Sequence, residues 1–298
     1  MSKTLKAVGL AAIAILFLMG PSLTPPISYS INLKYEIVPD QDSMPGGGVK
    51  LTWSTPYSSP GDIVSGGCKG GTVYTEEQED WQYIITLDGV DVDTVDQQGE
   101  HYEDQVYYVY TPCATIEAWP YCDGEKYGYG EKIEFRTEEE SSFEIWTVED
   151  FNYEYSRYPS GFGFDHSGSP YDYYVSYGGY WAAIDYYVDT DFVLHAGIDH
   201  DPSLNGRESS ISREEGSYDE LGTLKGFNEE NYQVSQQLEE GGLYGLRIEP
   251  RASGLRPAEE IHYGKLEVVA IDGEKITLKI LYQYEPEFRW VVGGVPPK

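Results

Sequence analysis

Apolar and polar residues alternate with a period of two through most of this 298-residue chain. The clearest case runs from Tyr263 to Tyr284, where two alternating runs flank Asp272-Gly273. A period of two places successive side chains on opposite faces, which is the pattern of a half-buried strand. We therefore predict an all-β fold of antiparallel sheets, each with one face in a core and one in water.

Three pairs of such runs are expected to form hairpins. Asp88-Gly89 separates residues 81–87 from 90–95, Gly178-Gly179 separates 171–177 from 180–188, and Asp272-Gly273 separates 263–271 from 275–284. Asp-Gly and Gly-Gly accept the positive φ angles of a two-residue hairpin turn. The one predicted helix is short, covering residues 229–240 and stopped by Gly241.

The chain divides into two expected domains. Six strands are predicted in the first half, at residues 49–54, 81–87, 90–95, 105–110, 114–121 and 131–136. The polar stretch 139–142 then serves as a linker, since charged and small residues mark domain boundaries. We predict two antiparallel β-sandwich-like domains in tandem, at 31–138 and 143–298, the second a sandwich or open barrel.

Residues 1–30 are interpreted as a signal peptide. Lys3 and Lys6 precede an apolar run from Ala7 to Met19, which falls short of the roughly 20 residues of a spanning helix. Ser28 and Ser30 predict cleavage near Ile31, and an uncleaved anchor is the alternative. We expect a secreted protein, extracellular or on the cell surface, that meets a membrane only through this segment if it is retained.

Net charge excludes nucleic acid as a default partner. The chain has 20 Lys and Arg against 51 Asp and Glu, which gives −31. Binding to phosphates, whether of nucleic acid or of anionic lipid, depends on Lys and Arg.

The first half resembles a fibronectin type III or related immunoglobulin-like domain. Three passages carry the resemblance: Val49–Ser54 with its Trp53, Trp81–Gly89, and Tyr108 followed by Ile116–Trp119 and Gly124, Gly128, Gly130, Ile133, Phe135 and Thr137. The resemblance implies a β-sandwich whose second strand carries a buried Trp53. Residues 57–80 exceed a typical connecting loop and depart from the pattern.

Under this resemblance, Cys68 and Cys122 lie in loops at the same end of the sandwich, so we predict a disulfide between them. A strand over 113–121 would separate Cys113 from Cys122 by about 30 Å, whereas a disulfide needs Cα atoms within about 7 Å. Cys113 is therefore expected to be free and buried. Three reduced or intermolecularly paired cysteines remain the alternative.

The second half has a weaker resemblance to HmuY-type secreted haem-binding domains, through Phe162–Asp165, Gly242–Arg247, Tyr263–Leu266 and Ile280–Tyr284. It implies an all-β fold that holds an iron between two side chains, typically His. Of the five histidines, His101, His166 and His262 are expected in surface loops.

Two sets of residues are candidates for binding. Oxygen and imidazole ligands for calcium or a transition metal gather at His195, Asp199, His200, Asp201, Asn205 and Glu208. A solvated turn is the alternative, because Asp, Asn and Gly form turns. Exposed rings for a glycan or a partner are expected at Tyr173, Tyr177, Tyr180 and Trp181. The alternative is that many of the rings in this aromatic-rich passage are core.

The sequence lacks the common nucleotide-binding, hydrolase, metalloprotease and EF-hand motifs. We predict an exported, non-catalytic binding or structural protein of the adhesion type, with no cofactor. Its partner would be a cell-envelope component, a glycan or a second copy. The alternative is capture of haem, metal or carbohydrate by the second domain. A carbohydrate-active enzyme with two facing carboxylates is the third hypothesis.

Overall fold

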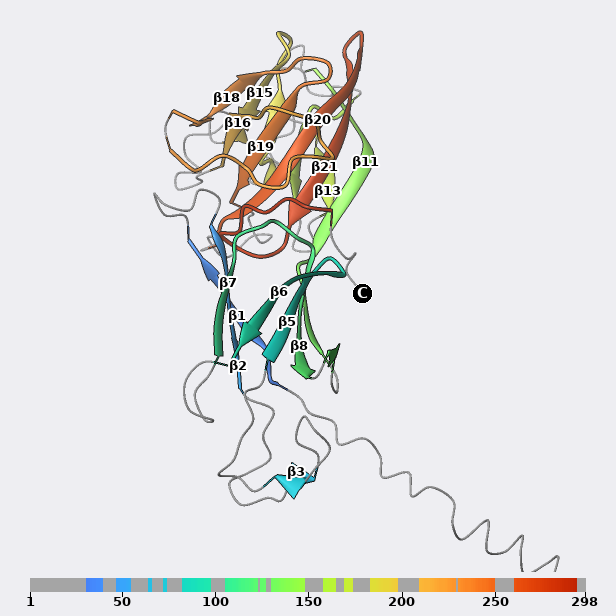
Figure 1. Ribbon diagram of the computed structural model, residues 1–298. Coiled ribbons are helices and arrows are strands. Elements are labelled where there is room, and N and C mark those ends of the chain that lie inside the picture. Colours follow the sequence, from blue (N-terminus) through green and yellow to red (C-terminus); the bar gives the residue numbers. More distant parts are fainter. Residues whose placement is uncertain are drawn as a thin grey trace, which may run out of the picture.

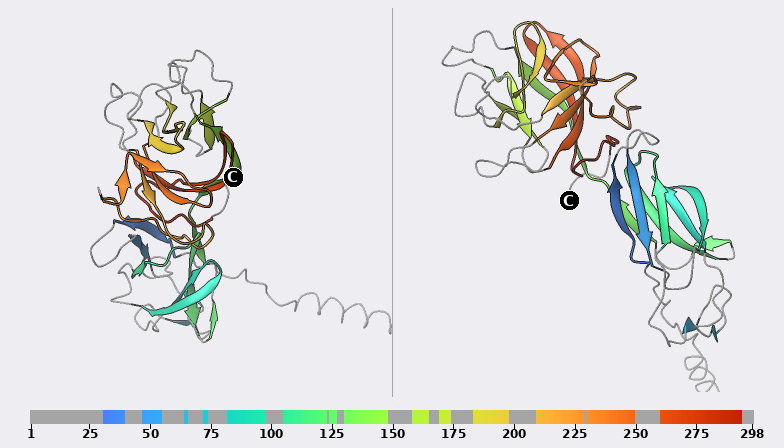
Figure 2. Two further views of the ribbon diagram at one scale, coloured as in Figure 1. Left: turned by 90° about the horizontal axis from the view of Figure 1, so that it is seen from above. Right: turned by 90° about the vertical axis from the view of Figure 1, so that its left-hand side faces the viewer.

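The computed structural model is built almost entirely of strands, arranged as two β-sandwiches placed end to end (Figures 1 and 2). It describes residues 31–39, 47–54, 64–65, 72–73, 82–97, 105–122, 124–126, 130–147, 158–164, 169–173, 183–197, 209–228, 230–249 and 260–293. The expected signal peptide at 1–30 lies outside these residues. No helix in the described part of the chain is long and apolar enough to span a membrane.

The first sandwich has a three-stranded sheet, in the order β1-β2-β7, facing a sheet in the order β10-β8-β5-β6, with β9 paired to β8. The bounds are β1 Lys34–Val38, β2 Gly48–Trp53, β5 Gln82–Leu87, β6 Val90–Asp96, β7 Gln105–Val109, β8 Thr115–Cys122, β9 Glu125–Lys126 and β10 Glu131–Glu134. All six strands predicted here are confirmed to within two residues, and β1 is additional. Within the long stretch 57–80, β3 (Val64–Ser65) pairs with β4 (Thr72–Val73).

The core of the first sandwich is built around Trp53, which is 1% exposed and meets Tyr83 edge to face at 5.2 Å between ring centroids. The Asp88-Gly89 turn is confirmed, with Leu87 paired to Val90 and φ angles of 47° and 80°. Asp88 also fixes the neighbouring strand, because its Oδ1 accepts the backbone N–H of Thr115 at 2.8 Å.

Cys113 is a buried free thiol, as the sequence predicts. Burial, with a smaller contribution from the charge of Asp88, raises the pKa of Cys113 to about 12. Cys68 and the side chain of Cys122 lie outside the described part, so their disulfide stays a prediction.

The prediction of a linker at 139–142 is corrected by the structure. These residues lie inside β11 (Thr137–Trp146), which pairs with β21 along its length. The charged residues are tolerated there because β11 is an edge strand with a side open to water. A bulge between Glu140 and Phe143 accommodates the two serines. Lys279 neutralises part of the acidic run, with Nζ 3.8 Å from Glu139 Oε1.

The second sandwich packs a six-stranded sheet, in the order β11-β21-β20-β19-β16-β17, against a five-stranded sheet, in the order β13-β12-β14-β15-β18. The bounds are β12 Gly161–Phe164, β13 Pro170–Tyr173, β14 Tyr186–Val188, β15 Val193–Ala196, β16 Ser210–Arg213, β17 Tyr232–Gln233, β18 Ser235–Gln237, β19 Leu243–Ile248, β20 His262–Asp272 and β21 Lys275–Gln283. Phe162, Tyr186 and Leu266 belong to the core between the sheets.

The hairpin predictions in this half have different outcomes. The pair β20 and β21 is confirmed, but Asp272 pairs with Lys275, so the turn residues are Gly273 and Glu274. For the hairpin predicted across Gly178-Gly179, the turn lies outside the described residues, and the pairing of its described strands is wrong. Strands β13 and β14 do not pair with each other, because β12 lies between them and pairs with both.

The predicted helix at 229–240 is also wrong, since these residues form β17 and β18. Its apolar residues have no helical spacing: Tyr232 and Leu238 are buried, whereas Val234 is 47% exposed. Backbone pairing of Gln233 with Ile211 and of Gln237 with Val193 overrides the local helix preference.

After β21 the chain returns to the first sandwich. Residues 284–293, which we name the C-terminal segment, follow β21 and lie at the junction of the two sandwiches (Figure 1). Phe288 and Trp290, each 1% exposed, join the first core, where their rings lie 4.9 and 5.9 Å from that of Phe135. Gln283 on β21 donates its Nε2–H to Trp290 O at 2.7 Å. The last residues described therefore complete the core of the first domain.

Candidate functional site

One row of residues crosses the five-stranded sheet. Backbone pairing aligns one residue from each strand in the order Tyr173, Gly161, Tyr187, His195 and Ser235. Paired residues on adjacent strands share a face. Since the alternate residues Phe162, Tyr186 and Leu194 are in the core, this row faces outward, and we name it the outer row.

Aromatic rings meet along the outer row. The ring of Tyr187 stacks on the imidazole of His195, with centroids 4.8 Å apart and planes inclined by 13°. Tyr173, half-buried, packs against the cluster of Tyr187 and Ile184. Gly161 separates the two tyrosines in the row and contributes no side chain, so their rings are free to approach each other.

Asp189 holds His195 in place. Its Oδ2 lies 2.8 Å from His195 Nε2, while its Oδ1 accepts the backbone N–H groups of Asp191 and Val193 at 2.9 Å each. The carboxylate thus fixes both the imidazole and the turn between β14 and β15. Phe192, in that turn, has a φ of 59°.

The pKa of Asp189 is lowered by this arrangement. Burial alone would raise it, but hydrogen bonds from His195 and from the backbone of Val193 and Asp191, with the charge of His195, outweigh burial. Asp189 is therefore an anion at neutral pH, and it favours a donor on His195 Nε2.

A second segment crosses the same face. Gly163 lies under residues 183–185, because a Cβ atom on it would lie 2.0 Å from Ala183 O. Asp185 fixes the crossing: its Oδ2 accepts the backbone N–H of Phe164 at 2.8 Å, and its own N–H donates to Phe162 O at 2.9 Å. The glycine in β12 is what allows two backbones to approach this closely.

The structure brings together one described member of each predicted set, Tyr173 of the aromatic set and His195 of the metal set. Tyr177, Tyr180, Trp181, Asp199, His200, Asp201, Asn205 and Glu208 lie outside the described residues. Within the described part, no group of three or more His, Cys, Asp or Glu side chains is placed to hold a metal ion. What this part offers is an imidazole–carboxylate pair, His195 and Asp189, whose side chains are 20% and 27% exposed and can orient a polar ligand. The Tyr187 ring is 5% exposed and supports the imidazole, while Tyr173 is half-buried.

Sequence reasoning missed Tyr187 and Asp189. The available signal was Asp189-Thr190-Asp191 just before the strand of His195, because aspartates before a strand commonly accept backbone N–H groups in a turn. His262, expected in a loop, lies in β20, with its Nδ1 3.1 Å from Gln283 O. Burial lowers the pKa of His262.

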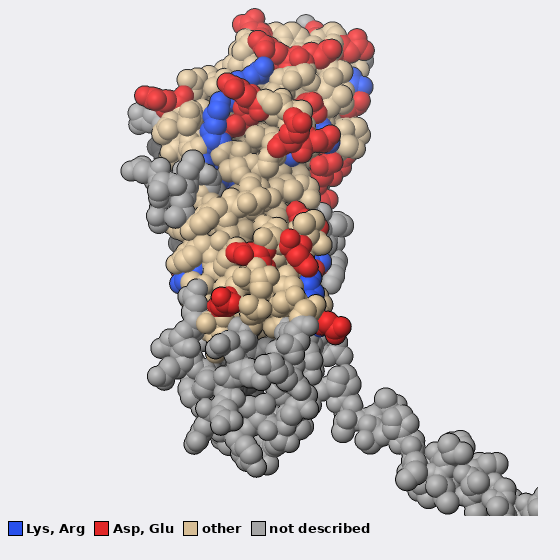
Figure 3. All heavy atoms as spheres, in the orientation of Figure 1, with Lys and Arg blue, Asp and Glu red and all other residues tan. Residues whose placement is uncertain are grey.

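Acidic side chains are visible on the second sandwich in Figure 3, and the charges of Glu139, Asp219 and Glu267 act on a buried lysine, Lys265. The alternation in residues 263–271 places Lys265 among the polar positions, on the face expected in water, but Lys265 is 3% exposed because residues 217–224 cover that face. Its Nζ donates to Tyr218 O at 2.6 Å and to Leu221 O at 3.1 Å. The centroid of the Tyr218 ring lies 4.3 Å from the ammonium group of Lys265 and 4.0 Å from that of Lys279. Burial lowers the pKa of Lys265 to about 8. This lysine fixes the covering segment.

Comparison with known proteins identifies no family. No family model matches the sequence, and no curated protein matches it significantly. One solved structure that aligns with the fold is that of a DUF4466 family protein from Parabacteroides merdae, with 9% sequence identity and a TM-score of 0.32 over 86% of this chain and 99% of the other.

Proposed function

We propose that this is an exported, non-catalytic protein of the adhesion type, which presents binding surfaces on two mechanically coupled sandwiches. The observation that carries the proposal is the C-terminal segment, which places Phe288 and Trp290 of the second domain in the core of the first. Domains joined only by a linker move independently by default, whereas a large apolar interface restrains them. A protein that connects a cell surface to a partner benefits from such restraint.

The order of strands in the first sandwich supports its assignment as a fibronectin type III-like module. When β3, β4 and β9 are left out, seven strands remain: β1, β2, β5, β6, β7, β8 and β10. The first, second and fifth of these form one sheet (β1-β2-β7), and the seventh, sixth, third and fourth form the other (β10-β8-β5-β6). The fourth strand therefore pairs with the third, not with the first sheet as in constant-type immunoglobulin domains. Modules of this architecture are common at cell surfaces, and that analogy is one of fold alone.

The experiment that tests the proposal determines where the protein is located and whether it binds fragments of the cell envelope. Intact producing cells would be treated with a protease that does not enter them, and the immobilised full chain would be tested against fragments of their envelope. We expect cleavage on intact cells, or recovery of the protein from the medium, together with saturable retention of fragments or self-assembly. A protein that stays protected inside cells, or that shows neither retention nor assembly, contradicts the proposal.

Ligand capture by the outer row is the second candidate, favoured by the contact of Tyr187 with an imidazole that a carboxylate orients. Thermal unfolding of the full chain would be followed with EDTA, calcium, zinc and haemin in parallel. A ligand that binds only the native state raises its stability. A rise of several degrees with one additive, lost in His195→Ala but kept in the more distant His262→Ala, supports capture. The same midpoint with all four contradicts capture of metal or haem.

A further inference from the structure

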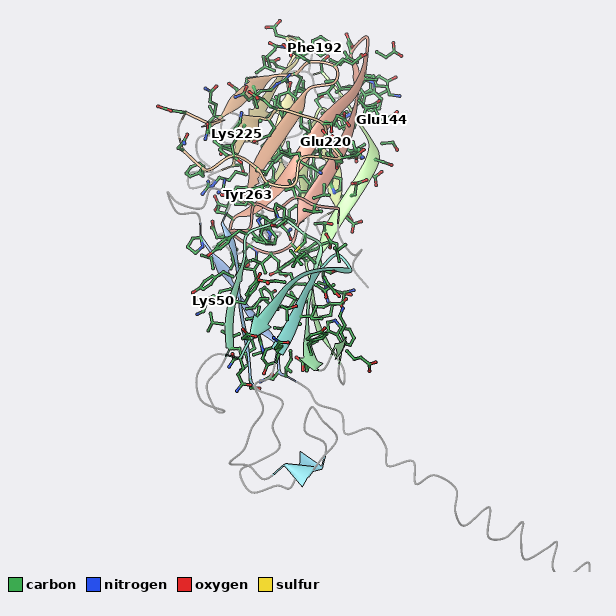
Figure 4. The ribbon with its side chains drawn as sticks, viewed as in Figure 1. Lys50, Glu144, Phe192, Glu220, Lys225 and Tyr263 are labelled. Carbon is green, nitrogen blue, oxygen red and sulfur yellow. The ribbon has the colours of Figure 1, made fainter. Side chains whose placement is uncertain are left out.

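We infer that the first domain carries a second binding surface, which goes beyond the function proposed above: a platform for neutral polysaccharide, made by Tyr108 and Tyr110 on the outer face of the sheet β1-β2-β7. This sheet belongs to the first domain, whereas the outer row lies on the second. Lys50, labelled in Figure 4, marks the surface on the flank of the first sandwich.

Backbone pairing places both rings on the outside. Val49 on β2 pairs with Val109 on β7, and both side chains are buried, so these positions face the core. Tyr108 and Tyr110 precede and follow Val109 and therefore face outward, and Tyr108 is paired with Lys50. The side chains are 46% and 41% exposed.

The two rings are parallel and preorganised. Their planes are inclined by 5°, with centroids 6.1 Å apart. Tyr110 lies against the backbone of β2, because a Cβ atom on Gly48 would lie 2.5 Å from its Cδ1. Gly48 is the residue that lets the ring lie so close to the strand. A ring held in this way loses little conformational freedom when a ligand stacks on it.

Polar side chains lie directly beside the rings. On the same face, Lys50 Nζ lies 3.2 Å from Glu36 Oε2, and the Glu36 side chain is 72% exposed. A sugar ring presents an apolar C–H face and a rim of hydroxyl groups. Parallel aromatic rings next to an exposed carboxylate and ammonium match both.

The net charge of the chain favours a neutral polysaccharide over an anionic one. A chain with a net charge of −31 repels anionic polymers. A protein partner docking through an apolar surface would require a contiguous apolar patch, whereas here Lys50 and Glu36 interrupt the face. Neutral polysaccharide is therefore the occupant to which we commit.

The net charge also provides the assay, because the full chain migrates toward the anode in a native gel. Gels would contain hydroxyethylcellulose, xyloglucan, β-1,3-glucan, galactomannan or amylopectin, with alginate as the anionic comparison. We expect retardation by at least one neutral polymer and none by alginate. Tyr108→Ala and Tyr110→Ala should each weaken binding roughly two- to tenfold, the effect of losing one aromatic contact.

Matched variants give the test its specificity. Tyr108→Phe keeps the ring and should bind within about twofold of wild type, while Tyr171→Ala removes a tyrosine that is 50% exposed on the second domain and should change nothing. If Tyr110→Ala does not fold, Tyr108→Ala decides. Absence of retardation by every neutral polymer, or retardation that both alanine variants retain, overturns the proposal. The proposal is also overturned if the protein binds no polysaccharide but self-associates, and Tyr108→Ala abolishes the self-association. That result would assign this face to a second copy of the chain.

Discussion

At the residue scale, side chains that look ordinary in the sequence fix the backbone over long distances. Asp88 was recognised as a turn residue, but the hydrogen bonds that it accepts from Ala114 and Thr115, at the start of β8, are visible only in the folded sheet. Lys265 occupies a polar position of a regular alternation and is nevertheless buried. Alternation identifies the two faces of a strand, but it cannot reveal that residues 217–224, about 45 positions away, cover one of them.

Lys265 should make stability depend on pH. Its pKa is about 8 in the folded protein against 10.5 in the unfolded chain, so between these values the unfolded chain binds more protons and stability rises with pH. Cys113 acts in the opposite direction above pH 9, because its pKa is raised on folding. The comparison that isolates Lys265 is therefore wild type against Lys265→Met.

We expect the advantage of wild type over Lys265→Met, measured by urea unfolding, to grow by on the order of 1–2 kcal/mol between pH 7.5 and 9.5. At pH 7.5 wild type should still be the more stable, since methionine leaves the carbonyls of Tyr218 and Leu221 without their donor. A difference that is constant with pH would contradict the pKa shift.

The cysteines give a second prediction at this scale. In denaturant without reductant, one thiol per chain should react with a thiol reagent, and three should react after reduction, because Cys68 and Cys122 are predicted to be paired. Peptide mapping of the labelled chain should place the single label on Cys113. Three reactive thiols without reduction would show that the pair does not form.

At the element scale, a strand pairing could be predicted from the sequence where the residues that determine it are close together in the chain. Strands β5 and β6, and likewise β20 and β21, are adjacent in the chain and joined by short turns with positive φ at Asp88, Gly89 and Gly273, and both hairpins were predicted. Strand β12 pairs with both β13 and β14, an arrangement set by packing of the sheet that no short segment encodes. The candidate site divides in the same way, since Tyr173 and His195 were identified singly, whereas their alignment in one row depends on β12 and β14.

The crossing of β12 by residues 183–185 predicts a sharp response to one methyl group. Gly163→Ala should destabilise the second sandwich by about 1–3 kcal/mol, because the added carbon overlaps the Ala183 carbonyl and one backbone must shift. Gly293→Ala, where a Cβ atom meets nothing within 4 Å, is the control and should leave the urea midpoint unchanged. Equal effects of the two substitutions would contradict close passage of the backbones.

At the scale of the whole molecule, the all-β architecture follows from the alternation, but the interlock of the domains does not. Phe288 and Trp290 lie in a short run after β21 with no periodic pattern, and nothing in that run specifies which core receives it. Long-range contacts position it: Val291 N–H donates to Gly222 O at 2.9 Å, and the rings of Phe288 and Trp290 pack against Phe135.

Trp290→Ala should therefore weaken the first sandwich more than the second, although residue 290 belongs to the end of the chain. We expect a loss of about 3–5 kcal/mol, the usual effect of removing a large buried ring. Hydrogen exchange of the intact chain should show faster exchange in β2 and β5, with β20 and β21 little changed. Acceleration confined to the C-terminal segment would contradict its role in the first core.

The position of Phe288 and Trp290 also sets the order of events when the protein is made. Domains generally fold in sequence as they leave the ribosome, at about 5–20 residues per second, yet the first sandwich lacks two large rings of its core until residue 290 has been synthesised. The delay from residue 138 to residue 290 is roughly 8–30 s at those rates. Throughout that interval the first domain remains incomplete, which is consistent with the export proposed above, since a chain that crosses a membrane unfolded completes its folding on the far side.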